Sequence, residues 1–279
     1  MIQWFPGHMA KARREIEERL KLVDIVFELL DARIPLSSQN PMISSLLQNK
    51  PKLVLLMKTD LADPLETKLW VDYFHKQGHQ VLEVNALSGF NSALIIKTSL
   101  QILEDKLLRE RKRGLKERAV RAMIVGIPNV GKSTIINRLV KRKAAKVGNK
   151  PGVTRAQQWI RISGKLELLD TPGVLWPKFE DKQTGLHLAI TGAIRDEILS
   201  SHDLGEYFLE FMRKYYPQNL SDRYQLDLKQ GNLDLVRKIS QDRGFFQSDN
   251  LERVYNLLLS DFRNSRLGRI TLDRYNQEE

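Results

Sequence analysis

The sequence predicts an α/β fold: a doubly wound, mostly parallel sheet followed by a small all-helical C-terminal domain. Apolar, β-branched runs alternate with amphipathic segments over the first 178 residues, as in parallel sheets with helices on both faces. One such run leads into a glycine-bounded loop and then into a helical period. Beyond Lys178 no strand is strong and helical periods dominate. We therefore expect an α/β domain over residues 1–178 and a helical domain over 179–279.

The strands and helices of the first domain follow from these periods. The run KLVLLM at 52–57 is apolar throughout, as expected of a strand buried on both faces. The expected strands are 23–30, 52–57, 80–84, 122–127, 156–163 and 165–169. The expected helices are 10–22, 42–48, 64–77, 91–108 and the segment after the glycine-bounded loop. We expect the charge-dense segment 104–121 to be a connector.

Two apolar patterns in the second domain have the spacing of buried helix faces. Asp203 and Glu206 resemble a capping box with an acid in place of the hydroxyl, and would start the first of these helices. The patterns consist of Leu204, Phe208, Phe211 and Tyr215, and of Leu251, Val254, Leu258 and Phe262.

The net charge of +11 is unevenly distributed. Between Ala119 and Leu166 there are 11 Lys and Arg residues and no acidic residue, so the rest of the chain carries 34 charges of each sign. A nucleotide needs only one or two of these cations. The excess favours a polyanionic partner, RNA above all, and segment 141–143 (Lys-Arg-Lys) is a candidate contact. The alternative is a solvated basic face that aids solubility.

Composition also indicates in which cellular compartment the protein works. The chain has no cysteine, which excludes disulfides and thiolate metal sites and fits a cytoplasmic protein. No apolar run approaches the ~20 residues that span a bilayer, so we expect no membrane contact. The N-terminal residues lack the apolar core of a secretory leader.

The loop 126–133, Gly-Ile-Pro-Asn-Val-Gly-Lys-Ser, predicts a phosphate-binding P-loop, the alternative being a chance glycine-rich turn. Its glycines allow backbone N–H groups to face phosphate oxygens, and the following helix presents its positive end to the same anion. Lys132 should reach the β- and γ-phosphates, and the Ser133 hydroxyl should coordinate Mg²⁺. The expected nucleotide-binding residues here are Asn129, Val130, Gly131, Lys132, Ser133 and Thr134.

A second phosphate-sensing element is expected at Asp-Thr-Pro-Gly, residues 170–173, where a strand ends about forty residues after the P-loop. Asp170 would hold Mg²⁺ through water, and the Gly173 N–H would meet the γ-phosphate. Thr154, in the loop between, is placed to coordinate Mg²⁺ when the γ-phosphate is present.

The base-reading residues are expected upstream of the P-loop. Strand 52–57 ends in Met57-Lys58-Thr59-Asp60, a near match to the Asn-Lys-x-Asp pattern of guanine-specific proteins, and strand 80–84 ends in Asn85-Ala86. A doubly wound sheet tolerates this order, because its ligand loops all emerge from one carboxyl edge. Segment 104–121 would then join the ends of the unpermuted fold.

This order resembles the circularly permuted GTPases, and most closely the bacterial ribosome biogenesis GTPase A family. The resemblance is carried by WFPGHMAKA at 4–12, DARIP at 31–35, the P-loop, PGVT at 151–154 and DTPG at 170–173 running into LWPK at 175–178. It covers nearly the whole chain and is weakest after about Asp203. It implies GTP hydrolysis coupled to late assembly of the large ribosomal subunit, and a helical domain that helps to bind ribosomal RNA.

Two positions depart from common GTPase patterns. The family has Asn where this chain has Met57, and a thioether neither supports the base nor ties the base loop to the P-loop well. Asp60 can still pair with guanine, so we expect guanine specificity with weaker affinity. Val174 stands where Ras-like proteins often have the glutamine that orients water.

Two residues are candidates to replace that glutamine. By resemblance, His8 matches the family's proposed catalytic histidine. Asn129 stands at a position that resembles the potassium-dependent GTPases, and this resemblance implies a possible K⁺ cofactor near the phosphates. The alternatives for His8 are a solvent-facing side chain or an RNA contact.

The whole sequence thus leaves three functions open. The first is a GTPase, a monomer that binds GTP and GDP and docks on the large ribosomal subunit. The second is an RNA-binding scaffold in which nucleotide is a structural ligand, slightly favoured by Met57 and Val174. The third is an adenine-specific ATPase, against which Asp60 argues.

Overall fold

The computed structural model describes residues 14–47, 50–140, 158–171, 181–194, 200–245 and 250–275. Its centre is a six-stranded sheet in the order β3-β2-β1-β4-β6-β5. Neighbouring strands are parallel except β5, which runs antiparallel to β6 at one edge. The strands are β1 (Ile25–Asp31), β2 (Lys52–Met57), β3 (Gln80–Val84), β4 (Val120–Gly126), β5 (Gln158–Ser163) and β6 (Leu166–Asp170). The predicted mostly parallel sheet is confirmed.

Helices cover both faces of this sheet, because alternate residues of its strands are apolar on both sides. On one face of β1, Val26 and Leu30 lie in apolar clusters with residues of helix 14–20, α2 (Pro41–Leu46) and α3 (Pro64–Lys76). On the other face, Phe27 and Leu29 share a cluster with residues of α4 (Ser92–Ile102) and α6 (Lys132–Val140). The sheet is therefore doubly wound, as expected.

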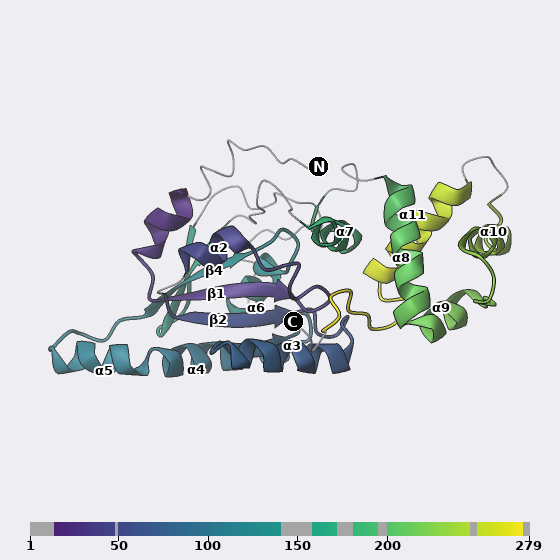
Figure 1. Ribbon diagram of the computed structural model, residues 1–279. Helices are drawn as coiled ribbons and strands as arrows, with labels where there is room; N and C mark the ends of the chain where they lie inside the picture. Colours follow the sequence, from purple (N-terminus) through teal and green to yellow (C-terminus); the bar gives the residue numbers. More distant parts are fainter. Residues whose placement is uncertain are drawn as a thin grey trace.

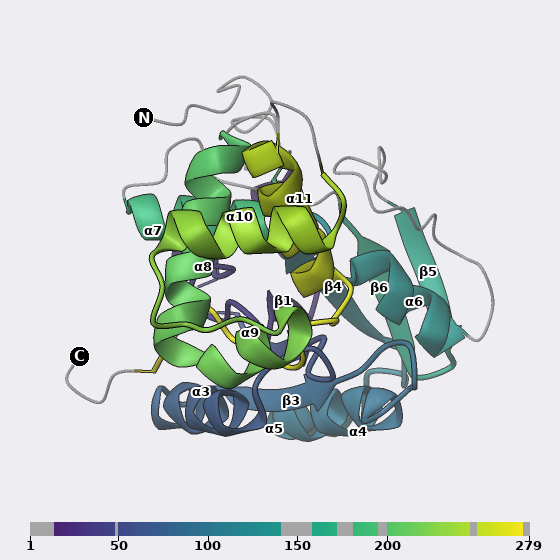
Figure 2. The same ribbon diagram turned by 90° about the vertical axis from the view of Figure 1, so that its right-hand side faces the viewer.

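The C-terminal part is helical, as predicted. It contains α7 (Lys182–Ile190), α8 (Ser201–Tyr215), α9 (Pro217–Tyr224), α10 (Asn232–Asp242) and α11 (Asn250–Arg263). Helices α8 and α11 pack together, with the rings of Phe208 and Phe262 5.1 Å apart. These helices lie beyond the arrowheads of the strands, at the carboxyl edge of the sheet, and Figure 2 shows them in front of that edge (Figures 1 and 2).

Several strands differ from their predicted bounds by one or two residues, and two helical segments differ by more. Helix α8 begins at Ser201, with Ser200 as its N-cap accepting a hydrogen bond from Asp203 N at 3.2 Å, so the predicted start at Asp203 is wrong. The expected helix 91–108 is divided at buried Leu103 into α4 and α5 (Glu104–Lys112), and the expected connector 104–121 therefore begins as a helix. The first turn of α5 is acidic and its last turn is basic, a distribution that stabilises a helix through its dipole. The high total charge of the segment hid this order in the sequence.

Residues 269–275, which we name the C-terminal strap, leave α11 and lie against the α/β part. Ile270 N donates to Leu61 O at 3.0 Å and Leu272 N donates to Arg33 O at 2.7 Å. Trp70 Nε1 of α3 donates to Asp273 O at 2.9 Å. This return was not predicted from the sequence. Within the described ranges, no helix has both the length and the apolar character needed to cross a membrane.

Candidate nucleotide site

The expected site residues follow strands that end at one edge of the sheet. The pairing of β1, β2 and β3 places Asp31 opposite Met57 and Met57 opposite Val84. On the other side of β1, Leu29 is paired with Gly126, the last residue of β4. The loops that are expected to read phosphate and base therefore emerge side by side, although they are far apart in the chain.

The P-loop turns between β4 and α6 through backbone conformations that its residues permit. Gly126 approaches β1 so closely that a Cβ there would lie 2.8 Å from Leu29 O, and Gly131 has a φ of +110°. Asn129 is left-handed, with a φ of 57°. Val130 is buried, whereas Ser133 and Thr134 are half-buried in the first turn of α6. The predicted strand, glycine-bounded turn and helix are all present.

The Lys132 ammonium bends back onto its own loop. Its Nζ donates to Gly126 O at 2.9 Å and to Ile127 O at 2.7 Å. Burial lowers the pKa of Lys132 to about 7, and the nearby Asp170 carboxylate partly offsets that shift. The cation expected to meet phosphate is thus held beside the turn by carbonyl oxygens.

Asp170, the last residue of β6, offers an oxygen to a metal. Its Oδ1 is buried and has no hydrogen-bond partner among the residues that the structure describes. Burial raises the pKa of Asp170 to about 6, and Lys132 partly offsets that shift. An unpaired buried carboxylate oxygen beside the first turn of the P-loop helix fits Mg²⁺ held through water, as expected from the sequence.

Asn129 joins the P-loop to the helical part. Its Nδ2 donates to Gly192 O, just beyond the end of α7, at 2.8 Å. Arg263 of α11 donates from Nε to Ile190 O at 2.9 Å and from Nη2 to Ala189 O at 2.8 Å. The phosphate loop is therefore linked through the end of α7 to α11.

The base loop, residues 57–62, begins at buried Met57. The methyl group of Met57 lies against the P-loop, where a Cβ on Gly131 would be 3.4 Å from Met57 Cε. The thioether thus contacts the P-loop by packing. Asp60 is exposed and Thr59 is buried.

Lys58 has a left-handed backbone, with a φ of 61°, and is held by an acid at the end of β1. Its Nζ donates to Asp31 Oδ2 at 2.9 Å, while Arg33 donates to both oxygens of Asp31 at 2.9 and 2.8 Å. Burial alone would raise the pKa of Asp31, but Arg33 and Lys58 hold it well below its ordinary value. Burial lowers the pKa of Lys58, an effect that Asp31 opposes. The sequence had offered no role for Asp31 and Arg33.

The second base-side turn follows β3. Asn85 Oδ1 accepts hydrogen bonds from Leu87 N at 2.9 Å and Ser88 N at 3.0 Å, which closes the turn around half-buried Ala86. Arg138 of α6 donates to Ser88 O at 2.6 Å. The helix that starts at the P-loop therefore also supports the turn expected to contact the base.

Three expected site residues, His8, Thr154 and Gly173, lie outside the described residues, as do Val174 and the basic segment 141–143. Besides Asp31 and Arg33, two further contributors were missed. Arg138 carried no local signal, and Arg269 of the strap donates to Thr59 O and Ala62 O from more than 200 residues away. Asp31 could have been found from the sequence, because an acidic residue at the end of a buried strand lies at the edge where the site is expected.

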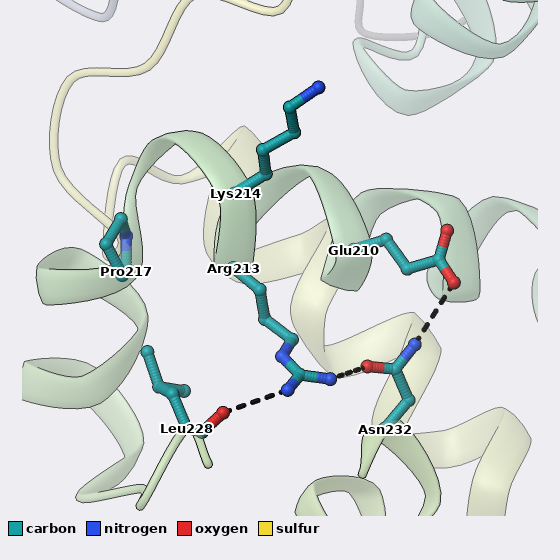
Figure 3. A pocket seen from close by; sticks show the side chains of 6 residues that line it. All are labelled: Glu210, Arg213, Lys214, Pro217, Leu228 and Asn232. Atoms are coloured by element: carbon teal, nitrogen blue, oxygen red, sulfur yellow. Dashed lines mark hydrogen bonds between the residues drawn. The ribbon is translucent and has the colours of Figure 1, made fainter. Parts of the chain in front are cut away.

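An open pocket of about 550 Å³ lies apart from this edge, between α8 and α10 (Figure 3). Arg213 Nη2 donates to Leu228 O at 2.9 Å, and its Nη1 donates to Asn232. Asn232 in turn donates to Glu210 at 3.3 Å. Since these polar groups bond one another, the sheet edge is the stronger candidate for chemistry.

Comparisons with known proteins agree with this geometry. A protein-family model described as a 50S ribosome-binding GTPase matches residues 121–224. Ribosome biogenesis GTPase A of Bacillus pumilus is 50% identical over 277 residues, which is 98% of each chain. Mitochondrial ribosome-associated GTPase 1 of Mus musculus is 35% identical and covers 98% of this chain and 90% of its own.

A solved structure has the same fold. The crystal structure of GNP-bound YlqF from T. maritima matches with a TM-score of 0.66 and 26% identity, covering 95% of this chain and 98% of that one. Sequence identity over nearly the full length, a matching GTPase family and a shared permuted architecture point the same way. The chain belongs to the ribosome biogenesis GTPase A family and is a circularly permuted GTPase.

Proposed function

We propose that this GTPase of ribosome biogenesis acts on the large ribosomal subunit by contacting ribosomal RNA, as a cytoplasmic monomer that binds GTP and GDP. The observation that carries the proposal is the sheet edge at which Lys58, Lys132 and Asp170 meet, with the helical part lying at that same edge (Figures 1 and 2). A nucleotide bound there touches elements that are linked to the helices.

Phosphate binding begins with Lys132. Its ammonium has three N–H donors, of which two bond the carbonyl oxygens of Gly126 and Ile127, so one is available for phosphate. The approaching negative charge of the β- and γ-phosphates favours its protonated form. Ser133 and Asp170, with Thr154 when the γ-phosphate is present, would hold Mg²⁺. That ion supplies neutralisation of phosphate charge when bound. The Gly173 N–H would contact the γ-phosphate.

The base is read by the loops after β2 and β3. Exposed Asp60 would accept hydrogen bonds from guanine N1–H and the 2-amino group, and the stem of Lys58 would lie along the ring. Residues Asn85 and Ala86 would close the pocket from the neighbouring turn. Adenine lacks both donors that Asp60 requires, so this arrangement favours GTP over ATP.

Hydrolysis needs a group that orients water, because Val174 cannot. We propose His8 for that role, and a K⁺ ion beside Asn129 as a possible source of further charge near the phosphates. The link from Asn129 to Gly192 and onward to Arg263 gives the phosphate site a physical route to α11. Nucleotide state could thereby change the orientation of the helical part.

Turnover and docking test this proposal together. GTP and ATP hydrolysis should be measured with and without large ribosomal subunits, alongside co-sedimentation in the presence of GDP or a non-hydrolysable GTP analogue. We expect GTP turnover that the subunit stimulates, and tighter co-sedimentation with the analogue than with GDP. Binding that ignores nucleotide state, with no stimulated turnover, would instead support the RNA-binding scaffold that Met57 and Val174 favour.

A further inference from the structure

The backbone of the base loop is held by the C-terminal strap. Arg269 donates from Nη2 to Thr59 O at 2.6 Å and from Nε to Ala62 O at 2.8 Å. Ile270 N donates to Leu61 O at 3.0 Å. These carbonyls lie on both sides of Asp60, so the strap fixes the peptide segment that carries the expected base-reading carboxylate.

The loop needs this external support because its own anchors are unusual. Met57 contributes packing where a polar side chain would add hydrogen bonds, and Lys58 has a left-handed backbone that a non-glycine residue adopts only when its surroundings hold it. The Lys58 side chain is held separately, by Asp31 at the end of β1. Between Asp31 and Arg269 the loop is fixed at both ends.

Arg269 is itself positioned by the turn from which it projects. It follows a tight turn after α11, in which Gly268 has a φ of +83° and a Cβ there would lie 2.6 Å from Asn219 Nδ2. Asn219 of α9 donates to Leu267 O at 2.9 Å, and Ile270 is fully buried. The arginine fork therefore projects from a backbone that the helical part fixes on one side and the sheet on the other.

We propose that Arg269 is a positioning residue for guanine recognition: by holding Thr59 and Ala62 it aims Asp60 at the base. This inference rests on the role of Asp60 in the proposed function. It makes the helical part a contributor to base specificity, because the residue that braces the base loop belongs to the chain leaving α11.

The test compares GDP with inosine diphosphate, which lacks the 2-amino group that Asp60 would bind. In Arg269→Ala we expect GDP affinity to fall about tenfold and inosine diphosphate affinity to fall clearly less, because misplacing Asp60 removes a hydrogen bond that only GDP makes. Arg269→Lys, which can reach one carbonyl but lacks the planar fork, should recover part of the preference. Calorimetric titration of the full-length chain gives each affinity.

Arg266→Ala is the matched control. Arg266 precedes the strap, is 57% exposed and pairs with Asp261 inside the helical part, so its loss should leave both affinities unchanged. Equal loss of GDP and inosine diphosphate in Arg269→Ala would overturn the proposal, since general loosening of the fold acts on both. Unchanged affinities in Arg269→Ala and Arg269→Lys would also overturn it.

Asp60→Asn separates this inference from the site assignment. An amide at that position should lower GDP affinity and improve binding of xanthosine diphosphate, whose ring carries an oxygen in place of the 2-amino group. If Asp60→Asn leaves base preference unchanged, the base site itself is wrong and the role of Arg269 fails with it. If Asp60→Asn switches preference and Arg269→Ala does not alter it, only the role of Arg269 fails.

Discussion

At the scale of single residues, Lys132 and Asp170 are neighbouring opposite charges whose charged forms are both disfavoured by burial. Burial lowers the pKa of one to about 7 and raises the pKa of the other to about 6. Because the folded-state pKa of Asp170 lies above its ordinary 3.8, its contribution to stability is present below that value and is lost as pH rises through 6. In the proposed function, Mg²⁺ would give the Asp170 carboxylate a cationic partner and phosphate would give Lys132 an anionic one.

Lys132→Ala should lower GTP and GDP affinity by about a hundredfold, because a charged donor to two phosphates contributes up to about 3 kcal/mol. Ser133→Ala should lower Mg²⁺-dependent turnover. Both should keep the melting temperature within a few degrees, because Ser133 is half-buried and the hydrogen bonds that Lys132 makes to described residues are to its own loop. Nucleotide titration and steady-state hydrolysis check this, and unchanged GTPase activity in either purified variant would contradict the P-loop assignment.

Met57→Asn should tighten GTP and GDP binding several-fold. An amide can add a hydrogen bond that contributes about 0.5–1.5 kcal/mol, which the thioether cannot form. Fluorescence titration with a labelled nucleotide measures the change. If affinity stays level or falls, the packing of the Met57 methyl against Gly131 is itself the tie between base loop and P-loop.

At the scale of elements, the joint of the permuted fold is held by one buried acid. Asp24, just before β1, accepts hydrogen bonds from Arg118 at 2.7 and 2.9 Å and from Arg121 N at 2.9 Å, and pairs with Lys106 of α5. Burial alone would raise its pKa, but these donors hold the pKa of Asp24 well below its ordinary value. The segment that joins the two halves of the permuted sheet is thereby fixed to the first strand.

Asp24→Asn should lower the free energy of unfolding by about 1–3 kcal/mol at pH 7, since it removes charge from a buried acceptor that several donors share. Because the folded-state pKa is depressed, the stabilisation is present above about pH 4 and is lost as pH falls. The gap between wild type and variant should therefore shrink below pH 4. Denaturant unfolding at several pH values measures this difference in the free energy of unfolding. A difference that does not change with pH would show that the ion pairs of Asp24 are not its cause.

Sequence patterns predicted elements well where local chemistry decides them. Strands β2 and β3 match their predicted bounds, because one is an unbroken apolar run and the other follows the left-handed turn at Gly78. The division of α4 from α5 has no glycine or proline to mark it, and a buried leucine, Leu103, lies where the two helices meet. The strand, turn and helix of the P-loop were predicted from spacing alone. The contacts of Arg269 were not predicted, because its partners are brought to it only by tertiary folding.

At the scale of the whole molecule, buried polar contacts join the sheet to the helices. Asp273 of the strap accepts from Ser37 Oγ at 2.6 Å and lies 2.6 Å from His187 Nδ1 of α7. His187 Nε2 lies 2.8 Å from the Tyr207 hydroxyl of α8. Apolar side chains of the helical part also share one cluster with one face of the sheet. The domain boundary proposed at residue 178 is thus crossed by many contacts.

Two variants, both at positions outside the described residues, should affect hydrolysis and subunit docking separately. His8→Ala should lower subunit-stimulated hydrolysis while sparing GTP affinity and subunit binding. The triple change Lys141/Arg142/Lys143→Ala should weaken docking and reduce its salt dependence by up to about three phosphate contacts, with intrinsic hydrolysis nearly unchanged. Sedimentation across a salt series and stimulated turnover give both readouts. Normal hydrolysis on the subunit with poor binding by His8→Ala would make that segment a docking element.

The return of the C-terminal strap also sets an order of events during synthesis. Thr59 leaves the polypeptide-synthesis machinery 210 residues before Arg269, the partner of its carbonyl oxygen. A nascent chain can therefore form the sheet and the P-loop while its base loop still lacks the bonds that fix it. With Arg269 in the proposed positioning role, full base selectivity would arise only after the helical part has been made.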